Sequence, residues 1–492
     1  MMDLKTKLIK STVWYGGTRF WIQVVSWAVT ILLARTLAPE DYGLFAMAFS
    51  VITFMELFQE FGLGVTIIQR PSFSKQQINA IFWVLFSASA LIVTVTFLVA
   101  WPLAEFYDEA RLVWIIRILS LTFFFNSIGT VPYSLLTKEI DFRRRSLAEV
   151  CAVVVSSGIS LVMAYGSYGV WALVLGQLAR SGVSSSVMFV SSRWVPGFQV
   201  SFTEMREMLK FSLHVAGGSA LGSLSDSLNS VIIGRFLGGY NLGLYSMAFG
   251  LGKSSPLHKL STGVINQLSL PLFSNLQRDT EELQKYFLKI TKYLAVISLP
   301  TQVGMALVAR DLILVLLSEK WLPITELFQV FAIGGVFSII ILPSYPLLTA
   351  RGRADTTFHY AWVSSLLIIA VYFVGSQWSL RVVSLGWLIV FPVLRLYLLK
   401  LSLREIGISF RKYLGNIATP TLAVMFMTLG VTVGGTVTQP WAPLERLFVT
   451  VTMGAAVYSV FLLFMDRKLT SELKTIALEL FASSTPRAIS RA

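Results

Sequence analysis

The sequence predicts an all-α polytopic membrane protein with about fourteen transmembrane helices. Two observations carry this fold class. Apolar segments of about 20 residues recur from one end of the chain to the other, each long enough to cross ~30 Å of hydrocarbon. In addition, one pair of these segments is repeated 200 positions later in the chain, which predicts two parallel-repeat halves of six helices each, followed by two C-terminal helices.

The composition supports a membrane protein rather than a soluble one. Hydrophobic residues make up 55% of the 492 residues and charged residues only 13%, against roughly one quarter charged in soluble domains. The predicted helices lie at 12–34, 42–67, 78–104, 112–136, 147–165, 169–191, 211–233, 241–262, 288–309, 322–349, 356–376, 381–400, 414–433 and 446–465.

The internal repeat is visible without a gap between Ile31–Ser50 and Val231–Gly250. Identical residues fall at Arg35/Arg235, Leu37/Leu237, Gly43/Gly243, Leu44/Leu244, Met47/Met247, Ala48/Ala248 and Phe49/Phe249. A duplicated membrane half is common in secondary transporters, whose substrate site lies between the halves. We therefore expect an N-lobe at 1–200, a C-lobe at 201–405, a final helix pair at 406–466 and a cytoplasmic tail at 467–492.

The distribution of basic residues predicts the orientation. Most Lys and Arg fall in alternate loops, which places those loops and both termini in the cytoplasm by the positive-inside rule. These loops account for most of the net charge of +14, so no nucleic-acid partner is expected. Cys151 is the single cysteine, and no internal disulfide is possible.

Several charged residues are predicted to lie inside the membrane, where a lone charge on a helix costs about 2.5–3.5 kcal/mol. Arg19, Glu56 and Lys253 share roughly one depth, and Glu60 lies one turn beyond Glu56. These residues fit a cationic lining for an anionic substrate, with Glu56 holding the bases or exchanging a proton. They also fit a structural ion pair between the two halves.

Polar stripes on two predicted helices, 12–34 and 211–233, point to a cavity; Asn229 lies on the second stripe, with Asp226 beside it. In the first helix, polar residues recur at helical spacing at Arg19, Gln23, Ser26 and Thr30. We expect Arg19 to be a base without a paired acid on this face. A polar face in a membrane helix must look at protein or water rather than lipid. Further candidate cavity residues are Arg117, Arg180, Asp226 and Asn229.

The sequence contains no complete catalytic or metal-binding motif. The segment Gly252-Lys253-Ser254 lacks the earlier glycine of a phosphate-binding loop, and the three histidines show no metal-ligand spacing. We therefore expect no catalytic residue and no metal site.

Four segments of the chain resemble a known protein family. It is similar to the Wzx-type polysaccharide flippases, and most of all to the colanic-acid exporter type, within the multidrug/oligosaccharidyl-lipid/polysaccharide exporter superfamily. The resemblance is carried by FGLGVTIIQR (61–70), GRFLGGYNLGLYSMAF (234–249), LPLFSNLQRDTEELQKYF (270–287) and SEKWLPITELFQVF (318–331).

The resemblance implies a V-shaped bundle of two six-helix lobes in the bacterial inner membrane. It implies a non-enzymatic transporter that moves an undecaprenyl-diphosphate-linked oligosaccharide repeat unit to the periplasmic leaflet by alternating access, for surface polysaccharide biosynthesis. Arg19 matches a first-helix position at which related flippases use arginine for the diphosphate. The expected partners are this lipid-linked oligosaccharide, membrane lipid, and polysaccharide polymerase or chain-length proteins. No cofactor is expected, and proton or sodium coupling stays open.

Two rival interpretations remain. A drug/cation antiporter of the same superfamily needs acidic residues in its N-lobe cavity; Arg19 argues against it, whereas Glu56 and Glu60 keep it open. A membrane polymerase or glycosyltransferase of the same pathway needs catalytic groups on its outer loops, and the outer loops predicted here are short.

Overall fold

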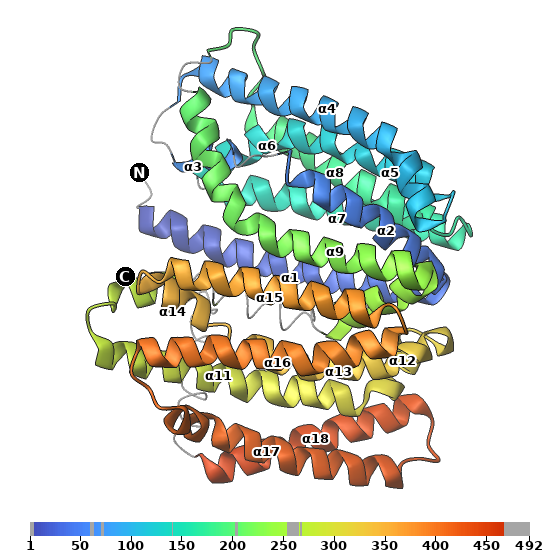
Figure 1. Ribbon diagram of the computed structural model, residues 1–492, viewed down its shortest axis with the longest axis vertical. Helices are drawn as coiled ribbons and strands as arrows, with labels where there is room; N and C mark the ends of the chain where they lie inside the picture. Colours follow the sequence, from blue (N-terminus) through green and yellow to red (C-terminus); the bar gives the residue numbers. More distant parts are fainter. Residues whose placement is uncertain are drawn as a thin grey trace. The chain divides into compact units, whose positions relative to one another are not determined.

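The regular secondary structure of the described residues is helical. The computed structural model describes residues 4–59, 63–69, 73–139, 141–201, 205–252, 265 and 268–466, with side chains described except at 4–16, 65, 69, 205–223 and 226. Within these ranges the regular elements are helices, with no strand (Figure 1). The predicted all-α class is confirmed.

The chain divides into two compact units. Unit 1 comprises residues 1–247, 316–324 and 358–387, and unit 2 comprises 248–315, 325–357 and 388–492. Unit 1 holds α1 (Leu4–Thr36), α2 (Pro39–Glu56), α3 (Leu63–Gln69), α4 (Lys75–Tyr107), α5 (Leu112–Ser120), α6 (Thr122–Lys138), α7 (Phe142–Tyr165), α8 (Trp171–Ser192), most of α9 (Met205–Gly252), the 3-10 helix η1 (Glu319–Ile324) and most of α15 (Ala354–Gly375). Unit 2 holds α11 (Thr280–Leu307), α12 (Ala309–Leu316), α13 (Thr325–Ile340), α14 (Ser344–Ala350), most of α16 (Leu380–Glu405), α17 (Phe410–Val437) and α18 (Pro443–Met465).

Among the described residues, ten helical stretches are long and apolar enough to cross a membrane, or eleven if α11 and α12, which meet at 77°, form one broken span. The protein is therefore a multi-pass membrane protein. Some predicted helices differ in detail from those observed. The segment predicted as one helix at 112–136 is broken at Leu121 into α5 and α6, and α11 begins at Thr280 rather than 288.

Polar side chains at the helix starts explain where several spans begin. Ser74 accepts a hydrogen bond from the Gln77 backbone N–H at 3.1 Å, and the Gln77 side chain accepts one from the Ser74 N–H at 3.0 Å. This reciprocal cap satisfies two of the N–H groups that a helix start leaves unpaired. Asp141 caps α7 and Ser409 caps α17 through one bond each.

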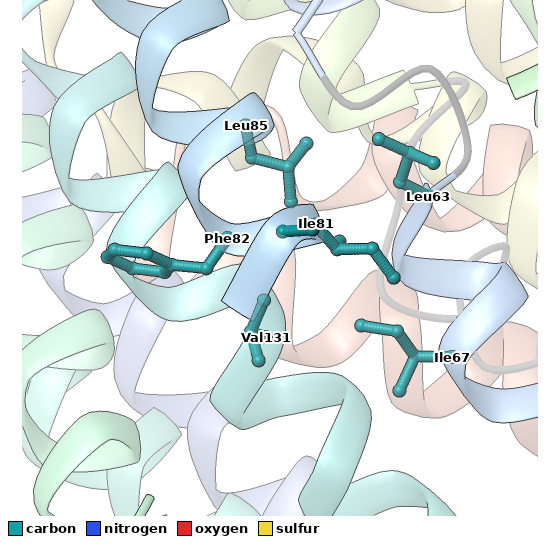
Figure 2. Packing of buried hydrophobic residues seen from close by; sticks show 7 residues of the cluster. Leu63, Ile67, Ile81, Phe82, Leu85 and Val131 are labelled. Atoms are coloured by element: carbon teal, nitrogen blue, oxygen red, sulfur yellow. The ribbon is translucent and has the colours of Figure 1, made fainter. Parts of the chain in front are cut away.

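A buried apolar cluster joins α3, α4 and α6 inside unit 1 (Figure 2). Ile81 and Leu85 from α4 lie against Leu63 and Ile67 from α3, and Val131 from α6 completes the cluster. All five side chains are nearly inaccessible to solvent. This packing orders the short helix α3, which at seven residues is too short to be stable alone.

The two copies of the sequence repeat cross each other within unit 1. A Cβ atom added at Gly43 of α2 would overlap the carbonyl oxygen of Gly239, and one added at Gly243 of α9 would overlap the carbonyl oxygen of Pro39. The two contacts are reciprocal, because positions 39 and 43 correspond to 239 and 243 in the repeat. Small residues allow helix backbones to approach this closely.

The turn predicted between the seventh and eighth helices is a single kink in α9. Gly238 has φ +79° and ψ 175°, a conformation that other residues rarely adopt, and helix continues on both sides of it. The repeat arginines flank the crossing. Arg35 donates to the Leu316 carbonyl at 2.9 Å, and the Arg235 guanidinium lies 5.5 Å from the centre of the Phe106 ring.

In unit 2, the last helix completes a hydrogen bond that a proline removes. Pro300 lies inside α11 and has no N–H, so the carbonyl of Val296 loses its helical donor. The hydroxyl of Tyr458 in α18 donates to that carbonyl at 2.8 Å. Arg446 at the start of α18 also binds Asp311 of α12, with Nε to Oδ2 at 2.7 Å. The pair α17–α18, side by side in Figure 1, is thus attached to the rest of unit 2 by specific polar contacts.

We predict that Gly43→Ala and Gly243→Ala each destabilise the protein by about 1–3 kcal/mol, because the added methyl group overpacks a backbone contact. This predicted loss of stability is opposite in sign to the effect of helix propensity, which favours alanine over glycine by about 1 kcal/mol. Thermal unfolding of the detergent-purified protein measures the effect. Gly250→Ala is the matched control, because a Cβ there meets nothing within 4 Å. Equal melting temperatures for all three variants and the wild type would contradict the close crossing.

We also predict that Tyr458→Phe lowers stability by about 1–3 kcal/mol, because a buried carbonyl is left unpaired. In a Pro300→Ala background the helix supplies its own N–H to Val296, so the same substitution should cost clearly less. A double-mutant cycle on thermal unfolding measures this coupling. An equal cost of Tyr458→Phe in both backgrounds would show that the hydroxyl does not replace the missing donor.

Candidate functional site

The candidate site lies inside unit 1, where α7 packs along α8 and α1. Two of these helices approach closely because their facing residues are small. A Cβ added at Gly176 of α8 would overlap the hydroxyl oxygen of Ser160 in α7. The facing surfaces are polar as well as small, with Ser156 and Ser160 one helical turn apart on α7. Polar faces within a membrane helix bundle face protein or water.

A cavity of about 270 Å³ lies among these helices. Its apolar wall consists of Val29, Phe45, Val153 and Leu173. Its polar lining consists of Ser26 and Thr30 from α1, Ser156, Ser157 and Ser160 from α7, and Gln177 and Arg180 from α8. We call this the serine cavity.

Arg180, a predicted site residue, is the only charged side chain among the described residues that line the serine cavity. It forms no hydrogen bond or ion pair with any described residue, and neither does Gln177 three residues earlier on the same helix face. The cavity therefore presents a guanidinium and an amide whose donors have no protein acceptor in the described structure.

Three charged side chains from two helices form an ion cluster. Arg19 of α1 lies 3.3 Å from the carboxylate of Glu149 in α7, and Arg145 lies 3.3 Å from the same oxygen. Arg145 also stacks on the Tyr133 ring, with 4.4 Å from its guanidinium carbon to the ring centre. Arg145 is 12% exposed and Arg19 48% exposed. One carboxylate is thus shared by one nearly buried and one half-exposed arginine, so the three side chains together keep one positive charge.

The ion cluster corrects one sequence-based expectation. Arg19 was expected to be an unpaired base, but Glu149 binds it from a position 130 residues away in the chain. The signal that could have found this pair is Glu149 itself, because an acidic residue inside a predicted membrane helix needs a partner.

A second, larger cavity of about 580 Å³ adjoins the ion cluster along the chain. Its lining includes Thr18 next to Arg19, and Ser146 and Val150 beside Arg145 and Glu149. Arg143, Arg144 and Asp141 also line it, and Asp141 lies 3.4 Å from Arg144, so the described lining is basic by one net charge. Along α7 the order is therefore basic cavity, ion cluster and serine cavity.

Arg117, another predicted site residue, contacts aromatic side chains. Its Nε donates to the Phe97 carbonyl at 3.4 Å, and its guanidinium lies 5.3 Å from the Phe97 ring and 5.4 Å from the Trp114 ring. The Phe97 contacts join α5 to α4, whereas Trp114 lies on α5 itself, and Arg117 does not line the serine cavity.

The remaining predicted residues are not gathered at this cavity. Gln23 is half-buried on α1, and Glu56 is the half-buried last residue of α2. Asn229 of α9 is buried, and its side-chain oxygen has no hydrogen-bond partner. Glu60, Lys253 and the side chain of Asp226 lie outside the described residues, so the expected approach of Glu56 and Lys253 stays a prediction.

A polytopic helical protein that keeps arginines and polar cavities within its membrane-spanning helices has the features of a transporter. A family model described as polysaccharide biosynthesis protein matches residues 32–326 of the chain. The chain belongs to this family.

Individual proteins agree with the family assignment. The chain is 24% identical over 444 residues to the lipopolysaccharide biosynthesis protein WzxC of Escherichia coli (strain K12), covering 88% of this chain and 90% of the relative. It is 24% identical over 474 residues to the teichuronic acid biosynthesis protein TuaB of Bacillus subtilis (strain 168), covering 93% and 95%.

The fold has a solved counterpart. The lipid II flippase MurJ, in its inward closed conformation, superposes with a TM-score of 0.74 and 14% sequence identity, covering 93% of this chain and 100% of that chain. The resemblance to Wzx-type polysaccharide flippases is therefore confirmed, and the chain has the fold of a solved flippase.

We predict that Glu149→Gln destabilises the protein by roughly 1–3 kcal/mol, and more than Arg19→Gln does. Removing the carboxylate leaves two arginines without their shared counter-charge, one of them nearly buried, whereas removing Arg19 leaves Glu149 paired with Arg145. Thermal unfolding in detergent measures both changes. Glu445→Gln is the control, because that exposed glutamate forms no ion pair with any described residue. If Arg19→Gln proves the more damaging change, the shared-carboxylate interpretation is wrong.

Proposed function

We propose that the protein moves an undecaprenyl-diphosphate-linked oligosaccharide across the bacterial inner membrane for surface polysaccharide biosynthesis. Its homologues are polysaccharide biosynthesis proteins, and its fold matches that of a lipid-linked substrate flippase. The single observation that carries the proposal is the basic character of the site in unit 1. Arg19, Arg145 and Arg180 lie within the helices around the serine cavity, and Glu149 is the one carboxylate among them.

The physical argument is that a diphosphate and a hydrophilic glycan cannot cross hydrocarbon unaided. Arginine forks bind phosphate oxygens with paired hydrogen bonds, so an arginine-lined path can replace the water around the diphosphate. In this proposal the substrate diphosphate takes over Arg19 from Glu149, while the polyprenyl chain stays in lipid. Arg145 keeps Glu149 paired during the exchange.

The proposal includes an architecture of about fourteen helices, with lobes at 1–200 and 201–405, a helix pair at 406–466 and a cytoplasmic tail at 467–492. The reciprocal contacts of Gly43 and Gly243 support the two-fold relation of the lobes. Both termini lie in the cytoplasm, and the lobes alternate in exposing the site to the two sides. Transport is coupled to protons or sodium ions, and the protein associates with a polysaccharide polymerase or chain-length protein.

The drug/cation antiporter is the rival that uses the same superfamily fold. It needs a carboxylate that is free to release a proton or to bind a cation. In the described part of the site, Glu149 is already held by two arginines. This pairing favours an anionic substrate.

Deleting the gene from its host tests the proposal. Surface polysaccharide should disappear, and the lipid-linked oligosaccharide should accumulate on the cytoplasmic side of the inner membrane. The wild-type gene should restore export, whereas Arg19→Ala should reduce export at least tenfold, equivalent to ~1.4 kcal/mol, with near-normal abundance in the membrane. Unchanged polysaccharide together with new sensitivity to cationic drugs would instead support the antiporter.

A further inference from the structure

We propose that the serine cavity binds one sugar ring of the transported oligosaccharide. This inference rests on the proposed function and adds to it a place for the glycan, separate from the arginines of the ion cluster.

Two hydroxyl groups of the lining have already used their protons. The Thr30 hydroxyl donates to the Ser26 carbonyl at 2.8 Å, and the Ser156 hydroxyl donates to the Val153 carbonyl at 3.2 Å. A hydroxyl that has donated its proton retains lone pairs. Thr30 and Ser156 therefore face the cavity as acceptors.

Gln177 and Arg180 supply the opposite capacity. Their amide and guanidinium N–H groups donate to no described residue. The two side chains lie three residues apart on α8, so they share one face of that helix. The cavity thus combines committed acceptors on α1 and α7 with available donors on α8.

This combination suits a sugar better than a phosphate. An ionised phosphate only accepts hydrogen bonds, so it could pair with Gln177 and Arg180 but would leave the acceptor oxygens of Thr30 and Ser156 without a donor. Each sugar hydroxyl both donates and accepts, so a sugar can satisfy both kinds of lining group at once. The apolar faces of a sugar ring can pack on the other wall of the cavity, where Phe45 and Leu173 lie.

The size and position of the cavity also fit one ring beside a bound diphosphate. A volume of about 270 Å³ lies just below the ~300–1,000 Å³ of pockets for drug-sized ligands. Ser26 lies seven residues beyond Arg19 on α1, which corresponds to roughly 10 Å along the helix. A diphosphate held at Arg19 therefore leaves its attached sugars within reach of the serine cavity.

Binding measurements on the purified full-length protein test this inference. The first probe is the lipid-linked oligosaccharide that accumulates in host cells lacking the gene, and the second is undecaprenyl diphosphate without sugar. The wild type should bind the first more tightly than the second. Gln177→Leu and Thr30→Val should each weaken binding of the oligosaccharide lipid by roughly tenfold, and change binding of undecaprenyl diphosphate by less than about twofold.

Thr36→Val is the matched control. The Thr36 hydroxyl also donates to a carbonyl of its own helix, Leu33 at 3.0 Å, but Thr36 does not line the cavity. This variant should bind both probes like the wild type. Valine has nearly the same shape as threonine, so Thr30→Val removes the hydroxyl without changing the packing. This variant therefore tests the cavity even if Gln177→Leu fails to fold.

The possible outcomes separate this inference from the proposed function. If Thr30→Val and Gln177→Leu weaken both probes equally, the cavity holds the diphosphate and the sugar assignment is overturned. It is also overturned if a folded variant binds both probes like the wild type, or if the wild type does not distinguish the two probes. If the wild type binds neither probe, the proposed function itself is overturned together with the inference.

Discussion

The close crossing of α2 and α9 is the contact on which the arrangement of unit 1 depends. At Gly43 and Gly243 each backbone touches the other through a carbonyl group that any side chain would displace. Without a hydrophobic driving force between helices in lipid, such close packing is a main source of association. The segments next to the crossing are held as well, since the Trp321 indole donates to the Ala34 carbonyl at 2.7 Å.

The same unit shows how a membrane protein can keep arginines inside its helices. Arg19 and Arg145 share the carboxylate of Glu149, which offsets one of their two positive charges. Arg180 has no such partner among the described residues, and it lies at a cavity instead. The ion cluster and the serine cavity therefore differ in chemistry. In the proposed mechanism the ion cluster exchanges its carboxylate for another anion, and the serine cavity offers donors and acceptors to a neutral sugar. A lipid-linked oligosaccharide contains both kinds of group in one molecule.

In unit 2, a contact from the last helix stabilises a helix that a proline interrupts. Pro300 interrupts the hydrogen bonding of α11, and Tyr458 from the last helix restores a donor to the exposed carbonyl. The ion pair between Lys292 and Asp466 lies at the other end of α18 from Arg446 and Asp311. The C-terminal helix pair is thus held along its length and not only by lipid around it.

The sequence by itself determined the all-α membrane class, the positions of most helices and the repeat that relates Gly43 to Gly243. These features are local, because hydropathy and residue identity are read along the chain. It also identified Arg19 and Arg180 as intramembrane bases. Only the tertiary structure decided what each base contacts. Glu149 reaches Arg19 across 130 residues, Arg117 stacks on Phe97 and Trp114, and Gln177 joins Arg180 at the serine cavity. The reason is that a helical pattern fixes which residues share a face, whereas the crossing of separate helices fixes which faces meet.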